Sequence, residues 1–142
     1  MARTMSSSEW QAFVSEGTRT AKVATVRADG RPHVAPVWFV LDGDTVVLMT
    51  GQETVKGRNL TRDPRMALCV DDERPPFAFV TLEGRAELSE DLDAMRLWAT
   101  RIAARYVGAE EAETFGARNA VPGELLVRIR VERAVAVTDL TD

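Results

Sequence analysis

Two Asp-Gly pairs divide residues 20–50 into three runs that are rich in β-branched and aromatic residues. Asp29-Gly30 and Asp42-Gly43 supply the positive φ that a tight hairpin turn needs, so each pair predicts a reversal of chain direction. Parallel neighbours would need a long crossover, usually a helix, between successive strands. These short connections leave no room for one, and the stretch therefore predicts an antiparallel meander.

The second of these runs, "GRPHVAPVWFV", holds two prolines and two adjacent aromatic residues. Pro32 and Pro36 cannot donate hydrogen bonds to a ladder, which places this run at an edge, at a bulge or beside a ligand. Trp38 and Phe39 are neighbours on one strand and must face opposite sides. We expect one of them in the core and the other over a ligand or a subunit surface.

Three further runs complete the expected sheet: "MALCVDD", "FAFVTLEGRAEL", which we expect to bend at Gly84, and the alternating "ELLVRIRVERAVAV". The only cysteine, Cys69, rules out an intrachain disulfide, and its apolar neighbours favour a buried, inert thiol over a nucleophile. The order of elements predicts one mainly β domain over residues 1–142, a small six-stranded antiparallel barrel with inserted helices.

Three helices are expected around this sheet, apart from a short one at residues 54–65. Ser6 and Glu9 form a capping box before a short apolar stripe. Ser89 is expected to cap a longer helix, with acidic residues in its first turn and arginines near its end. The predicted buried stripe of that helix is Leu92, Met95, Ala99, Ile102 and Tyr106. "AEEAETFGAR" predicts a further short helix.

Composition limits the class of partner. The chain has 142 residues, a net charge of -4 and a pI near 5.1. An acidic chain lacks the basic face that binding to bulk nucleic acid requires. No apolar run approaches the ~20 residues that span a bilayer, and the first residues lack the apolar core of a signal peptide. We therefore expect a cytoplasmic protein whose anionic ligands are small and met by a local cluster of cations.

Such a cluster stands at residues 54–65, "TVKGRNLTRDPR". Thr54 is expected to cap a short helix that Pro64 ends. A helix start, a threonine hydroxyl and Lys56 together make a phosphate site. The alternative is a solvated helix with its arginines in surface ion pairs, and the spacing matches no general phosphate motif.

No residue pattern identifies a catalytic acid, base or nucleophile. His33 is the only histidine, and no second nitrogen or sulfur ligand stands near it for a metal. His33 and Tyr106 are secondary candidates for substrate contacts. If the chain is an enzyme, its reactive chemistry is expected to belong to a cofactor.

The segments "ATVRADGRPHVAPVWF", "TVKGRNLTRDPR" and "TLEGRAEL" together resemble the pyridoxamine 5′-phosphate oxidase-like split β-barrel flavoproteins. The chain is most similar to their actinobacterial branch of deazaflavin (coenzyme F420)-dependent oxidoreductases. This resemblance implies an FMN-binding-like split barrel that forms a homodimer with cofactor sites at the interface. The chain differs at Phe79, where pyridoxamine phosphate oxidases place a polar residue, and it lacks their basic residues near the C-terminus.

The resemblance also implies a set of cofactor-binding residues. The ring would lie along Pro36, Val37 and Trp38, with Met49 and Thr50 near the ring and its ribityl chain and Phe79 against the ring. Lys56 would bind the phosphate with help from Arg58 and Asn59. The implied cofactor is F420 or, as the alternative, FMN.

The implied activity is hydride transfer from the reduced deazaflavin to an electron-poor acceptor such as an enone, a quinone-like compound or a tetrapyrrole. Two alternatives remain open at this point. One is an FMN-dependent oxidoreductase on the same fold, and the other is a non-catalytic protein that binds F420 or a tetrapyrrole.

Overall fold

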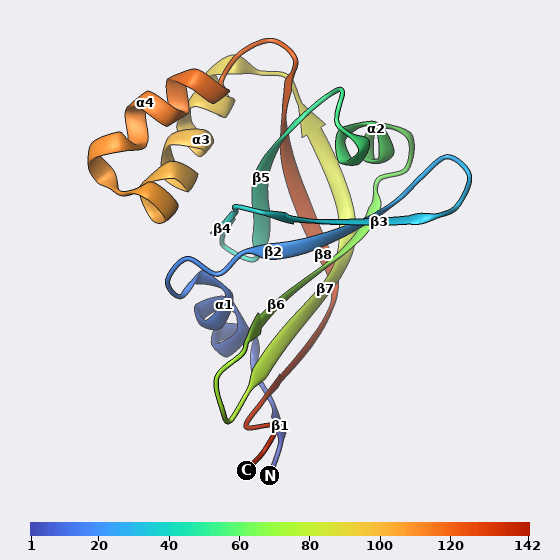
Figure 1. The fold of residues 1–142 in the computed structure, drawn as a ribbon, viewed down its shortest axis with the longest axis vertical. Helices are drawn as coiled ribbons and strands as arrows, with labels where there is room; N and C mark the ends of the chain where they lie inside the picture. The colour runs from blue at the N-terminus through green and yellow to red at the C-terminus, as the bar shows by residue number, and fades with distance from the viewer.

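The structure, a computed structural model, describes residues 1–142 and contains one antiparallel sheet and four helices (Figure 1). The strands are β1 (Arg3–Thr4), β2 (Ala21–Val26), β3 (Pro32–Val37), β4 (Val40–Asp42), β5 (Thr45–Gly51), β6 (Arg65–Asp72), β7 (Ala78–Ser89) and β8 (Glu124–Thr138). The helices are α1 (Ser7–Ser15), α2 (Val55–Arg62), α3 (Leu92–Val107) and α4 (Ala109–Asn119).

The mainly β class and the split-barrel architecture are confirmed, although the sheet has eight strands and not six. The two additions are short: β1 pairs with β8, and β4 is the end of the proline-containing run, cut off at Trp38. The strand order is β3-β2-β6-β7-β8-β5-β4. The end strands β3 and β4 follow one another in the chain, so the sheet curls until its edges meet at Trp38 and Phe39 without closing.

Local sequence signals explain most of this framework. Gly30 and Gly43 adopt the positive φ values of 89° and 62° that the two hairpins require. Gly84 is the site of a register shift between β7 and β8, and a Cβ there would lie 2.1 Å from the Arg130 carbonyl oxygen. β3 is an end strand, which is where its two prolines are tolerated.

The main core fills the inside of the curled sheet. Its fully buried members include Phe39, Leu48, Leu82 and Ile129. Trp38 is 43% exposed whereas Phe39 is 0% exposed, which confirms that the two adjacent rings face opposite sides. α3 and α4 pack side by side at one end of the sheet, away from the two termini (Figure 1).

The predicted start of α3 is wrong. Asp91, not Ser89, is the N-cap, and its carboxylate accepts hydrogen bonds from the backbone N–H groups of Asp93 and Ala94. Ser89 is instead the last residue of β7, paired with Leu126 of β8. The buried stripe also differs from the prediction: Trp98 and Ala103 join it, and Leu92 is 43% exposed.

Cys69 is half-exposed, which corrects the expectation of a buried thiol. It lies on the outer face of the sheet, because its neighbours Leu68 and Val70 point into the core. None of the helices combines the length and the apolar composition needed to cross a bilayer.

Candidate functional site

The start of α2 is fixed against the end of β5. The Thr54 hydroxyl accepts a hydrogen bond from Gly57 N and donates to the Gly51 carbonyl oxygen at 2.8 Å. It also lies 3.1 Å from the Thr50 hydroxyl. A Cβ on Gly57 would lie 2.0 Å from the Gly51 carbonyl oxygen, so only glycine permits this approach. The expected Thr54 cap is therefore confirmed, and it sets the position of Lys56 two residues later, in the first turn of α2.

Lys56 differs from the other cations of the segment. It is half-buried, and the structure gives its ammonium group neither an ion pair nor a hydrogen bond. Burial lowers the pKa of Lys56, because no carboxylate offsets the loss of water around its charge. A desolvated cation beside two threonine hydroxyls and a helix N-terminus is a ready site for an anion.

The three arginines of the segment already have partners. Arg58 pairs with Glu53 at 2.9 Å, and Arg65 pairs with Asp63 at 2.8 Å. The Arg65 guanidinium holds the pKa of Asp63 at about 2. Arg62 donates to the Val26 carbonyl oxygen. The solvated, paired alternative thus describes the arginines, whereas Lys56 remains available.

Beside Lys56 lies a cavity of about 500 Å³ that has a polar and an apolar side. A volume of this size suits a ring-containing ligand. The polar side holds the ammonium group, threonine hydroxyls and one carboxylate, and the apolar side holds aliphatic and aromatic side chains. The lining residues are Thr20, Pro36, Val37, Trp38, Met49, Thr50, Gly51, Thr54, Lys56, Ala99, Ile102, Ala103, Phe115, Asn119 and Glu124.

Six of the nine residues that the resemblance implied as cofactor-binding line this one cavity. They are Pro36, Val37, Trp38, Met49, Thr50 and Lys56. They come from β3, the residue after it, β5 and α2. β3 and β5 lie near opposite ends of the strand order and approach each other because the sheet curls, and α2 follows β5 directly.

The structure does not bring the other three residues into the cavity. Asn59 is 3% exposed and donates a hydrogen bond to the Thr25 hydroxyl, which ties α2 to β2. Arg58 lines a separate, mostly polar cavity of about 540 Å³. Phe79 lies on the outer face of the sheet, paired in register with Asp71 and Val137.

Sequence reasoning missed the helical wall of the cavity. Ala99, Ile102 and Ala103 of α3 and Phe115 and Asn119 of α4 all line it. The expected buried stripe included Ala99 and Ile102, but helical periodicity does not distinguish a core from a cavity wall. A possible signal was the pair of alanines one turn apart, since small side chains leave space beside a helix.

The two secondary candidates occupy different places. Tyr106 is half-buried, and its ring stacks on Trp38 with centroids 5.0 Å apart and planes 4° apart. His33 pairs in register with Thr25 of β2 and has a buried Nδ1 without a hydrogen-bond partner. It does not line the cavity of Lys56.

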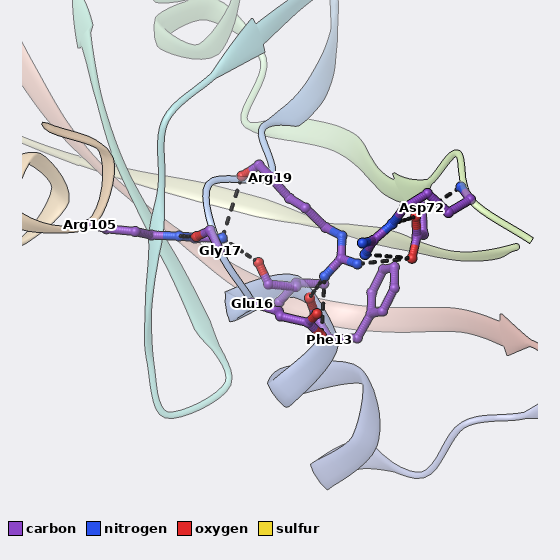
Figure 2. Close-up of polar contacts among 8 residues, drawn as sticks. Phe13, Glu16, Gly17, Arg19, Asp72 and Arg105 are labelled. Carbon is purple, nitrogen blue, oxygen red and sulfur yellow. Dashed lines mark hydrogen bonds and ion pairs between the residues drawn. The ribbon is translucent and has the colours of Figure 1, made fainter.

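Next to Tyr106, Arg105 ties α3 to the sheet. Its guanidinium donates hydrogen bonds to the carbonyl oxygens of Gly17, Phe39, Val14 and Arg19 at 2.7–3.4 Å. Figure 2 shows Arg105 reaching the Gly17 and Arg19 segment, where the Arg19 side chain turns away to Asp72. Burial lowers the pKa of Arg105 as it does that of Lys56, but here backbone oxygens surround the charge.

The split barrel thus has a cavity of ring-holding size with a half-buried lysine among its polar lining residues. The sequence profile described as pyridoxamine 5′-phosphate oxidase matches residues 6–138. The chain belongs to this family.

Three similar proteins sharpen the comparison. The F420H(2)-dependent biliverdin reductase of Mycobacterium tuberculosis is 32% identical over 134 residues, which cover 92% of this chain and 88% of the relative. The crystal structure of a conserved hypothetical protein of the same organism is 30% identical with a TM-score of 0.81, covering 93% of this chain and 84% of that one. A structure named as an F420 reductase is 25% identical with a TM-score of 0.68, covering 87% and 94%.

Proposed function

We propose that this protein is an F420-dependent reductase that transfers hydride from the reduced deazaflavin to an electron-poor small molecule. The observation that carries the proposal is Lys56, a half-buried cation without a partner at the polar end of a ring-sized cavity. The F420H(2)-dependent biliverdin reductase relative and the F420 reductase structure support the choice of cofactor.

We expect such a cofactor to lie along the cavity with its phosphate at Lys56 and its ring toward Trp38. Lys56, the start of α2 and the hydroxyls of Thr50 and Thr54 would hold the phosphate. Met49 and the segment Pro36, Val37 and Trp38 would face the ribityl chain and the ring. A bound phosphate would restore the counter-charge that Lys56 lacks, which favours binding at this end and sets the direction of the ring.

When bound, a reduced deazaflavin supplies a hydride from its ring C5 to the acceptor. The chain contributes orientation and exclusion of water through the apolar side chains of α3 and α4. Apart from Lys56, the only ionisable side chain that lines the cavity is Glu124. The proton that completes the reduced product would therefore come from solvent or through Glu124.

A fluorescence titration of the purified protein with F420 and with FMN tests the proposal. We expect F420 to bind more tightly, and we expect the protein with reduced F420 to reduce one of an enone, a quinone or a linear tetrapyrrole. Tighter binding of FMN with flavin-dependent turnover would replace the proposal with an FMN-dependent oxidoreductase. Tight F420 binding without hydride transfer to any of these acceptors would make the protein a carrier.

We also propose that the protein forms a homodimer through the outer face of the sheet. Val34 is 66% exposed there, and the same face carries Ala24 of β2, Ala67 and Cys69 of β6 and Val135 of β8. A second copy would cover these small and apolar side chains and place a partner surface beside Pro36, which borders both the face and the cavity. Light scattering of wild type and Val34→Lys would test this: we expect a dimer and a monomer, and a monomeric wild type would contradict it.

A further inference from the structure

Trp38 presents its indole to the cavity from a break in the sheet. It stands between the last residue of β3 and the first residues of β4, outside both ladders, and it is 43% exposed. An indole in such a place would normally exchange between rotamers, since no strand neighbour packs against it. The side chain here is instead stacked face to face on Tyr106, with planes 4° apart.

Tyr106 is itself held at its far end. Its hydroxyl donates to the Arg19 carbonyl oxygen at 2.7 Å and accepts from the Phe39 backbone N–H at 3.3 Å. Burial raises the pKa of Tyr106, so the phenol stays protonated and able to donate. A ring that is fixed by two backbone groups is a rigid support for the indole above it.

The backbone beneath Trp38 is fixed from the same helix. The Tyr106 hydroxyl accepts a hydrogen bond from the Phe39 backbone N–H, and Arg105 donates to the Phe39 carbonyl oxygen at 2.7 Å. Both backbone groups of the residue after Trp38 are therefore bonded to the last turn of α3. This arrangement sets the direction of the Trp38 side chain as well as its rotamer.

We propose that Tyr106 is a positioning residue that holds the Trp38 indole as a flat wall for a planar, conjugated ring bound in the cavity. The ligand class follows from the wall: an aromatic face beside the aliphatic side chains of Ala99, Ile102 and Ala103 favours an extended heteroaromatic system over a sugar or an aliphatic chain. The inference rests on the proposed function, in which this ring belongs to the deazaflavin or to its acceptor.

A double-mutant cycle with F420 as the probe tests the inference. Tyr106→Leu removes the stack and both hydrogen bonds, and we expect the F420 dissociation constant to rise about fivefold. Trp38→Leu removes the wall and should have an effect of similar size. If Tyr106 acts through Trp38, adding Tyr106→Leu to Trp38→Leu should change the dissociation constant by less than about twofold.

Tyr106→Phe keeps the ring and provides the second measurement if Tyr106→Leu does not fold. We expect it to weaken F420 binding about twofold in the wild-type background and not at all beside Trp38→Leu. Tryptophan emission gives an independent signature, because F420 should quench it less when Trp38 is free to rotate.

The outcomes separate this inference from the proposed function. Effects that multiply in the double variant, or a Tyr106→Leu protein with wild-type affinity, would overturn the inference while leaving F420 binding intact. A folded wild-type protein that binds neither F420 nor FMN would overturn both.

Discussion

Lys56 and Arg105 are two half-buried cations of one chain, and burial lowers the pKa of both. Arg105 has its charge surrounded by the carbonyl oxygens of Val14, Gly17, Arg19 and Phe39. Lys56 has no such partner and faces a cavity. The difference separates two uses of a desolvated charge: one is satisfied and ties elements together, and the other is left for a ligand.

The largest effect should follow removal of the satisfied cation. Arg105→Met leaves the carbonyl oxygens of Val14, Gly17 and Phe39 without this donor, whereas the Arg19 carbonyl oxygen keeps the Tyr106 hydroxyl. The change removes bonds that join α3 to α1 and to the segment between β3 and β4. We expect the free energy of unfolding to fall by about 3 kcal/mol. Urea denaturation would measure it, with Arg101→Met as the matched control, because Arg101 is exposed on the same helix. If both variants lost the same free energy of unfolding, Arg105 would contribute no more to stability than an exposed arginine.

The next largest effect should follow a change at Gly57, whose contact with Gly51 positions α2 and therefore Lys56. Gly57→Ala places a methyl group 2.0 Å from the Gly51 carbonyl oxygen, so α2 must move away from β5. We expect a loss of about 2 kcal/mol of stability and weaker F420 binding, because Lys56 moves with the helix. Gly30→Ala is the control for the strain of a substituted glycine, since its positive φ lies in the turn between β2 and β3 with open space around it. If Gly57→Ala binds F420 as tightly as wild type, Lys56 does not contribute to the F420 site.

The pH dependence of binding should report the state of Lys56. An anion binds the protonated ammonium, so the F420 dissociation constant should rise as the pH passes upward through the lowered pKa of this lysine. The phosphate of F420 is a diester that carries one constant negative charge across this range, so it adds no slope of its own. Titrations that extend upward from neutral pH toward the ordinary lysine value of 10.5 should show the rise in wild type. A flat profile in wild type would mean that Lys56 does not meet the phosphate.

The smallest effect is expected for Lys56→Met on the free energy of unfolding. The folded pKa of Lys56 lies below its unfolded value of 10.5, so between these values the unfolded chain holds more protons and stability rises with pH. Below that window the desolvated charge opposes folding. Lys56→Met should therefore keep or slightly raise the unfolding free energy at neutral pH and abolish the rise. A clear loss of stability would show that Lys56 is structural, like Arg105.

Local patterns predicted the frame of the site, because its decisive contacts are close in sequence. Thr54 caps α2 through Gly57, three residues away, and the hairpin glycines follow the turns beside them. The predicted capping residue of α3, Ser89, was wrong for a reason that lies far away in the sequence. Pairing with β8 extends β7 through Ser89. Because Ser89 pairs with Leu126 in the sheet, the helix begins later and Asp91 becomes its N-cap.

The division of the proline-containing run was also beyond local patterns. Phe39 leaves the strand ladder because Arg105 and Tyr106, 66 and 67 residues further along the chain, bond its backbone groups. Likewise, four cations in one segment look alike in sequence. Only the fold separates Lys56 from Arg62, which reaches the carbonyl of Val26 on a neighbouring strand.

The central claim is that Lys56 is the phosphate-binding cation of an F420 site, and a fluorescence titration of three proteins with F420 tests it most directly. The proteins are wild type, Lys56→Met and the control Arg65→Met, which removes an exposed, paired cation from the same segment. We predict that the dissociation constant rises more than about tenfold in Lys56→Met, on the order of 2 kcal/mol, and stays within about twofold in Arg65→Met. Equal F420 affinity in Lys56→Met and wild type would contradict the claim.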